Sequence, residues 1–149
     1  MTNLYLDMNI YNRPFDDQSQ MRIRLETVAI TMIFTLIESG HFSTRWSFVL
    51  EYENSRNPFP ERRAYVRYVA QSCDSTVEPD ESIRELAKQL SERHKIRGRD
   101  ALHLACAELS RCHYLVTCDD RLIRQGERLR EKGVLTLRVI NPIDLLREV

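Results

Sequence analysis

The stretch RDALHLACAELSRCHYLVTCDD, residues 99–120, decides the fold. Its first half is a strongly apolar run that opens with the acid Asp100, a pattern that predicts a helix beginning near Arg99. Its second half predicts a short strand, Tyr114 to Thr117, that stops at a pair of acids. An apolar helix that leads into a strand ending on carboxylates is the most specific pattern in the chain.

The same strand-then-acid pattern occurs at the N-terminus, where the run Leu4 to Leu6 ends on Asp7. Between these stretches, apolar periodicity and Gly, Pro and polar breaks predict strands that alternate with helices. The segment NRPFDD, residues 12–17, reads as a loop. We expect strands at 4–6, 41–45, 72–79, 114–117 and 135–140, and helices at 18–39, 47–56, 61–71, 81–96, 99–112, 121–133 and 141–149.

Alternating strands and helices favour a parallel sheet with helices on both faces. The predicted fold is therefore a three-layer α/β/α sandwich with a central, mostly parallel five-stranded sheet. A chain of 149 residues is most simply one domain, residues 1–149, and is large enough to bury a core without disulfide bonds or structural metals.

The carboxyl ends of parallel strands gather at one edge of the sheet, where sites in such folds usually lie. Asp7 and Asp119 would then face each other across one cleft. Asp100 begins a helix so apolar that its N-terminus is expected to point inward, toward the same edge. Three acids far apart in the sequence are thus predicted to meet.

The resemblance of the sequence to a known family rests on four stretches in order: LYLDMN at the start, LEYE near residue 51, RDALHLACA at residue 99 and LVTCDD at residue 115. Together they resemble the PIN domain, a small metal-dependent ribonuclease fold common among bacterial toxin–antitoxin systems. The segment NRPFDDQ also resembles a subgroup of stand-alone bacterial PIN proteins. The resemblance implies a nuclease, either a VapC-like toxin or a stand-alone ribonuclease.

Carried over to this chain, the acidic site of the family implies Asp7, a glutamate of LEYE, Asp100 and Asp119. Glu51 and Glu53 both lie within reach of the motif, and we favour Glu53 because it lies one helical turn beyond the apolar Val49 and Leu50. The remaining candidates are an alternate acid and two supporting polar side chains: Asp120, Thr117 and Asn9.

Four crowded carboxylates repel one another unless a cation is present. Mg²⁺ or Mn²⁺ suits such oxygen ligands, and a metal-bound water attacks phosphodiesters readily because its pKa is lowered. We expect Asp7, Asp100 and Asp119 to be metal ligands. Glu53 is expected either to join them or to deprotonate the attacking water. The expected reaction is the hydrolysis of single-stranded or structured RNA.

The charges of the chain balance, with 22 basic and 22 acidic residues, so no global field attracts a polyanion. An arginine rim around the acids would supply local attraction for phosphates. The candidates for RNA contact lie near the acids in the sequence: Arg13, Arg56, Arg97, Arg99, Arg121 and Arg124.

The family resemblance also implies partners, since many PIN toxins form homodimers and are neutralised by a small antitoxin. The run VAITMIFTLI, residues 28–37, favours a dimer because it exceeds what one small domain readily covers, yet it is too short to span a membrane. The N-terminus shows no secretory signal pattern, and the four cysteines form no CxxC pair. We therefore expect a cytoplasmic protein with free thiols and no membrane association.

Two rival interpretations fit the sequence poorly, and a third stays open. Phosphatases of the haloacid dehalogenase type also place an aspartate after the first strand, but they need a second one at the position of Asn9. A zinc site on Cys106, Cys112, His103 and His113 fits no compact zinc motif, and His103 reads as a packed or hydrogen-bonded residue. The non-enzymatic alternative is a degenerate PIN module that binds RNA or a protein without cleavage.

Overall fold

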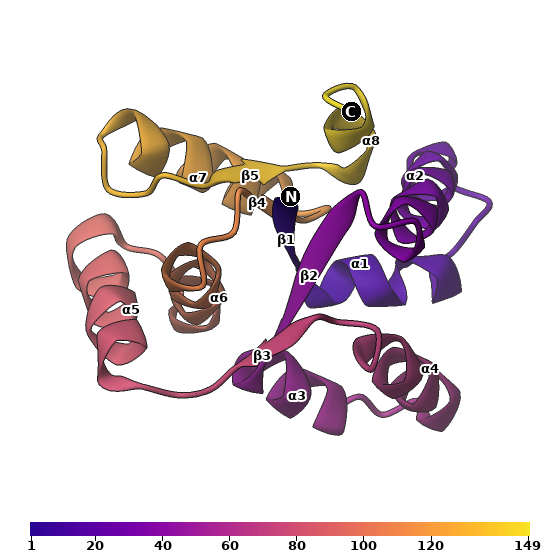
Figure 1. The fold of residues 1–149 in the computed structure, drawn as a ribbon, viewed down its shortest axis with the longest axis horizontal. Helices are drawn as coiled ribbons and strands as arrows, with labels where there is room; N and C mark the ends of the chain where they lie inside the picture. Colours follow the sequence, from indigo (N-terminus) through magenta and orange to yellow (C-terminus); the bar gives the residue numbers. More distant parts are fainter.

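The computed structural model describes residues 1–149 and contains one five-stranded sheet between two layers of helices (Figure 1). All four strand pairings are parallel, and the strand order is β3-β2-β1-β4-β5. The predicted three-layer α/β/α fold is confirmed. The strands are β1 (Thr2–Leu6), β2 (Phe42–Ser47), β3 (Ser75–Val77), β4 (Tyr114–Val116) and β5 (Arg138–Ile140).

Helices α5 and α6 lie on one side of the sheet, and α1, α2 and α4 lie on the other (Figure 1). None of the helices combines the length and the apolar character that crossing a membrane requires. The helices are α1 (Met8–Asn12), α2 (Met21–Glu38), α3 (Phe48–Ser55), α4 (Pro60–Ala70), α5 (Glu81–His94), α6 (Gly98–Leu109), α7 (Asp120–Glu131) and α8 (Pro142–Leu146), with a 3₁₀ turn η1 (Arg13–Phe15).

Several segments differ from the sequence prediction. The third strand is Ser75–Val77 rather than residues 72–79, and α2 begins at Met21 rather than at residue 18. The expected loop at residues 12–17 is largely helical, because the Asp7 carboxylate caps α1 by accepting the Met8 N–H and Pro14 lies in the first turn of η1. The fifth strand is three residues long rather than six. Residues 135–137 do not pair with β4, because the Glu108 carboxylate accepts the backbone N–H groups of Thr136 and Leu137 instead.

The core is centred on β1, whose Leu4, Tyr5 and Leu6 are almost fully buried. A strand of a parallel sheet covered on both faces is expected to be apolar throughout, and β1 follows that rule. Helix α7 approaches β5 closely at Gly126, where an added Cβ would lie 2.7 Å from the Cβ of Val139. Only glycine fits this contact, which fixes how α7 sits on the sheet edge.

The register of the central strands positions the candidate site. Leu6 pairs with Val116, and the Asp7 N–H continues the ladder by donating to the Val116 carbonyl at 3.0 Å. The chain runs outward from β1 to β2 and β3, then crosses to β4 and β5 on the other side of β1. The boundary between β1 and β4 is therefore a topological switch point, the usual place for a site in a parallel sheet.

Candidate metal centre

Four carboxylates from different elements line one pocket of about 440 Å³ at this edge of the sheet. Asp7 follows β1, Glu53 lies on α3 after β2, Asp100 lies in the first turn of α6, and Asp119 follows β4. The other lining residues are Met8, Asn9, Arg97 and Arg99. The structure thus brings together four acids that are distant in the sequence.

Asp7 is the most constrained of the acids. One carboxylate oxygen, Oδ1, accepts the Met8 N–H at 2.8 Å, and the other, Oδ2, accepts the Thr117 hydroxyl at 2.8 Å and the Asn9 amide at 3.2 Å. The Asn9 amide also donates to Thr117 Oγ1, and its carbonyl oxygen accepts the Cys118 N–H. Asn9 and Thr117 therefore link the ends of β1 and β4 and hold Asp7 in place.

Glu53 is held by a buried histidine. His103 Nε2 lies 2.7 Å from Glu53 Oε1, and His103 Nδ1 lies 2.7 Å from the Tyr5 hydroxyl. The Tyr5 hydroxyl is also 2.6 Å from Ser47 Oγ, which caps α3 by accepting the Leu50 N–H. A polar chain thus runs from the start of α3 through the core to Glu53. His103 was expected to be hydrogen-bonded, and it is.

Asp100 and Asp119 share one arginine. The Arg97 guanidinium lies 3.5 Å from Asp100 Oδ2 and 3.9 Å from Asp119 Oδ2. Asp119 also caps α7, with Oδ1 accepting the N–H groups of Arg121 and Leu122. Oδ2 of Asp100 is buried but has no hydrogen-bond partner. The ion pair with Arg97 compensates this oxygen only in part, because no N–H or O–H group donates to it.

The pKa values in the pocket reflect burial and crowding. Burial raises the pKa of Asp7, against the opposing influence of His103 and the Thr117 hydroxyl. Burial also raises the pKa of Asp100, and Asp119 adds to that rise while Arg97 opposes it. Burial alone would lower the pKa of His103, but the hydrogen bond to the Glu53 carboxylate and the charge of Asp7 raise it overall. The pocket therefore favours additional positive charge.

The residues present fit a hard divalent cation. Carboxylate oxygens are the ligands that Mg²⁺ and Mn²⁺ prefer, and Asp100 offers an oxygen with no other donor. Ligand atoms of Asp7, Glu53 and His103 also lie within 4.8 Å of one another. Both His103 nitrogens are already engaged by Glu53 and Tyr5, however, so this side chain is better suited to orienting Glu53.

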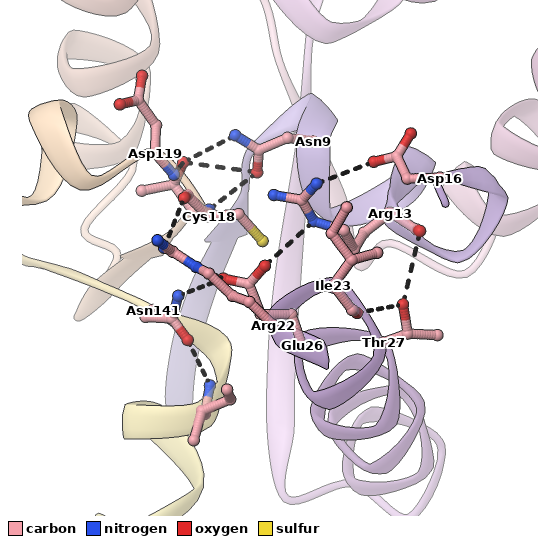
Figure 2. Close-up of polar contacts among 12 residues, drawn as sticks. Asn9, Arg13, Asp16, Arg22, Ile23, Glu26, Thr27, Cys118, Asp119 and Asn141 are labelled. Atoms are coloured by element: carbon pink, nitrogen blue, oxygen red, sulfur yellow. Dashed lines mark hydrogen bonds and ion pairs between the residues drawn. The ribbon is translucent and has the colours of Figure 1, made fainter. Parts of the chain in front are cut away.

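A buried ion network supports the site from the side of α2 (Figure 2). Glu26 is fully buried, and its carboxylate lies 3.3 Å from Arg13 Nε, 3.3 Å from Arg22 Nε and 2.7 Å from the Asn141 amide, which donates to it. Arg22 in turn makes a bidentate pair with Asp120 and donates to the Cys118 carbonyl. The network joins α2 to the segment that carries Asp119.

Several predicted residues lie outside the pocket. Asp120 points to Arg22, and Glu51 is exposed on α3. Arg13 is largely buried between Asp16 and Glu26. Arg56 lies over the Tyr52 ring. Arg97 and Arg99 line the pocket, with Arg99 3.6 Å from Glu53 Oε2, whereas Arg121 and Arg124 are exposed on α7.

Sequence reasoning overlooked the Glu26 network and the contact between His103 and Glu53. A signal for the first was present, because Glu26 sits beside the most apolar run of the chain, where an acid needs a buried partner. The spacing of His103 three residues after Asp100 was a signal for the second, since both side chains then lie on one helix face.

Comparisons with known proteins bear on the family and on the fold. The model of the PIN domain family matches residues 4–128. No curated protein matches the chain. Among solved structures, the fold is similar to a chain in the crystal structure of VapBC2 from Rickettsia felis. That complex is bound to a DNA fragment from the promoter of VapBC2. The TM-score is 0.57 at 15% sequence identity, over 94% of this chain and 98% of that one.

Proposed function

The chain belongs to the PIN domain family, and on that premise we propose that it is a Mg²⁺- or Mn²⁺-dependent endoribonuclease acting on single-stranded or structured RNA. The observation that carries this proposal is the convergence of Asp7, Glu53, Asp100 and Asp119 on one pocket. Four acids at a topological switch point, one with a buried oxygen that accepts no hydrogen bond, suit a metal-dependent hydrolase better than a surface turn.

In this proposal Asp7, Asp100 and Asp119 would hold the ion. Thr117 and Asn9 fix the rotamer of Asp7, so that its carboxylate does not reorganise when RNA arrives. Asp120 is assigned no ligand role because it is engaged by Arg22. A bound Mg²⁺ or Mn²⁺ supplies a water of lowered pKa and offsets negative charge on the phosphoryl oxygens.

Glu53 is the candidate general base. Its Oε1 is held by His103, and its Oε2 faces Arg99 at 3.6 Å. A carboxylate fixed on one oxygen keeps a lone pair on the other in a constant direction, which suits it to orient a water and accept its proton. Arg97 and Arg99 would contact the scissile phosphate or its neighbours, replacing their present pairs with Asp100, Asp119 and Glu53.

Cleavage of a mixed single-stranded RNA pool tests the proposal. The measurement compares wild type with Asp100→Asn, each with Mn²⁺ and with EDTA. We expect cleavage that needs both the metal and Asp100. Cleavage that persists in Asp100→Asn would indicate a contaminating nuclease or a different site.

Two glutamate variants make the test of the site sharper. Glu53→Gln is expected to abolish cleavage, whereas Glu51→Gln, two residues away and exposed, serves as the matched control and is expected to cleave like wild type. Absence of both cleavage and Mn²⁺ binding by calorimetry in the wild type would favour the non-catalytic module instead.

We further propose that the protein acts in the cytoplasm as the toxin of a type II toxin–antitoxin pair. The fold shared with VapBC2 supports this proposal. The measurement is co-expression with the product of the neighbouring gene. A stable complex with suppressed RNA cleavage is expected. A neighbour that neither binds nor inhibits would favour a stand-alone ribonuclease.

A homodimer is proposed on the basis of α2. Four apolar side chains on this helix are more than half exposed and follow one face at helical spacing: Met21, Leu25, Val28 and Met32. A continuous apolar stripe of this kind usually marks an interface. Sedimentation is expected to show a dimer for wild type and a monomer for Val28→Glu. A wild type that stays monomeric at high concentration would contradict the assembly.

A further inference from the structure

A second charged feature lies between the end of α5 and one side of α7. It is a groove of about 370 Å³, and six of its nine lining residues are three arginines, two lysines and a histidine. No acid lines it. We call it the basic groove, and its basic residues are Arg93, His94, Lys95, Arg121, Arg128 and Lys132. In a chain with no net charge, so many cations in one place require an explanation.

Helix α7 carries no acid on the face that lines the basic groove. One face bears positions i, i+4, i+7 and i+11: Arg121, Gln125, Arg128 and Lys132. The acids of the helix share the neighbouring face: Asp120, Glu127 and Glu131. Here the acids are kept off the face that lines the groove.

The cations of the basic groove are also unpaired. None of them forms an ion pair or a side-chain hydrogen bond, whereas Arg97 and Arg99 in the acidic pocket both pair with carboxylates. Like charges gathered without counter-charges repel, and a bound anion relieves that repulsion. Lys95 follows α5 with a φ of 58°, in the left-handed region where glycine is favoured at a helix end. A lysine therefore occupies a position of the groove at which the backbone favours glycine.

The linings of the basic groove and the acidic pocket lie two residues apart along the chain at two places. Arg121 follows Asp119 by two residues and donates its backbone N–H to that carboxylate at 2.9 Å. Lys95 precedes Arg97 by two residues, and Arg97 contacts both Asp100 and Asp119. The face of α7 that lines the groove, from Arg121 to Lys132, is about 16 Å long, because an α-helix rises about 1.5 Å per residue. That length matches about five stacked nucleotides of one strand.

We propose that the basic groove holds the sugar–phosphate backbone of the RNA on one side of the scissile bond, leading the strand into the acidic pocket. This inference rests on the proposed ribonuclease function. The apolar lining consists of Ile96 and Leu129 and contains no aromatic ring on which a base could stack. The groove therefore binds phosphates irrespective of sequence, and base preference arises elsewhere.

The test measures binding separately from cleavage. Fluorescence anisotropy with a labelled 20-nucleotide single-stranded RNA in EDTA gives Kd at several salt concentrations. The test variant is Arg128→Glu/Lys132→Glu. The control, Arg24→Glu/Arg67→Glu, makes the same charge change at exposed, unpaired arginines of α2 and α4. Thermal unfolding checks that each variant folds.

We expect Arg128→Glu/Lys132→Glu to weaken binding by about tenfold and to reduce the slope of log Kd against log salt by about 1.4, or about 0.7 per lost contact. In cleavage assays KM is expected to rise with little change in kcat. Lys95→Gly is expected to bind RNA more weakly while raising the unfolding midpoint, a combination that a purely structural role would not produce.

The outcomes distinguish the two proposals. Equal Kd and equal salt slope in the test and control variants would show that the basic groove is not an RNA site. The remaining candidate for its occupant would then be an acidic protein segment. If the protein binds RNA through the groove but never cleaves it, the groove stands as an RNA-binding site and the proposed ribonuclease function is wrong. A wild type that does not bind RNA would overturn the groove even if cleavage occurs.

Discussion

His103 on α6 and Glu53 on α3 are joined by a contact of 2.7 Å between Nε2 and Oε1, although 50 positions separate them in the sequence. The other nitrogen of the same imidazole contacts Tyr5 on the central strand. One buried side chain thus connects the core of the sheet to an acid of the pocket. The position of Glu53 is set by the fold before any ion or RNA is present.

Replacing His103 with phenylalanine is expected to lower the free energy of unfolding by about 1–3 kcal/mol, because the Tyr5 hydroxyl and Glu53 lose their partner. Urea unfolding in EDTA measures the loss, and Mn²⁺ is expected to recover part of it by engaging Glu53. His41→Phe, at an exposed position, is the control and should change stability by less than about 0.5 kcal/mol. Equal effects at the two positions would contradict the proposed role of His103 in holding Glu53 and Tyr5.

The stabilisation that Mn²⁺ provides is expected to grow with pH. Burial raises the pKa of Asp7 and Asp100 above the ordinary value of 3.8, so the folded protein binds their protons more tightly than the unfolded chain does. The metal-free protein therefore loses stability as pH rises through these raised pKa values. Mn²⁺ offsets the loss because it binds the ionised carboxylates.

The measurement is the shift in Tm caused by Mn²⁺ at pH 5 and at pH 8, with a larger shift expected at pH 8. Asp100→Asn should flatten this dependence. A shift of the same size at both pH values would show that Asp7 and Asp100 do not bind the ion.

The two ion pairs of Arg22 are expected to differ in strength. Glu26→Ala should cost about 3–5 kcal/mol because it leaves Arg13 and Asn141 facing a buried gap without their shared acceptor. Asp120→Asn removes an exposed partner of the same arginine and should cost less than about 1 kcal/mol. Chemical denaturation of both variants checks the ranking, and a reversed order would refute it.

The contact between α7 and β5 predicts an unusual glycine effect. Gly126→Ala improves helix propensity by about 1 kcal/mol, but overpacking against Val139 should cost about 1–3 kcal/mol and outweigh it. Gly98→Ala, also in a helix, meets open space and should be neutral or stabilising. Unfolding midpoints in urea measure both. A more stable Gly126→Ala would mean that α7 shifts on the sheet at little cost.

The fold followed from the sequence because its signals are local and repeated. Short apolar runs that end on polar residues fixed the strand ends near Asp7 and Asp119, and the apolar run after Asp100 fixed α6. The helical segment after Asp7 was less predictable, since it depends on one capping contact to Met8. The short β5 depended on Glu108, a residue 28 positions before Thr136, which no local pattern relates to it.

The candidate site was partly predictable for a similar reason. Acids at strand ends can be found from topology alone, and the four favoured acids do line one pocket. Directions of side chains cannot be found in this way. Asp119 and Asp120 are equivalent in the sequence pattern, but only the packing of α2 brings Arg22 close enough to engage Asp120. The role of His103 in holding Glu53 likewise depends on the packing of α6 against α3, which the sequence does not reveal.

The pairing of β1 with β4 has a consequence for synthesis of the chain. Asp7 and Thr117 are 110 positions apart, and a ribosome adds about 5–20 residues per second. For about 5–20 seconds after Asp7 is made, its partners do not yet exist. A nascent or truncated chain therefore carries only fragments of the acidic pocket, which is assembled only when translation is almost complete.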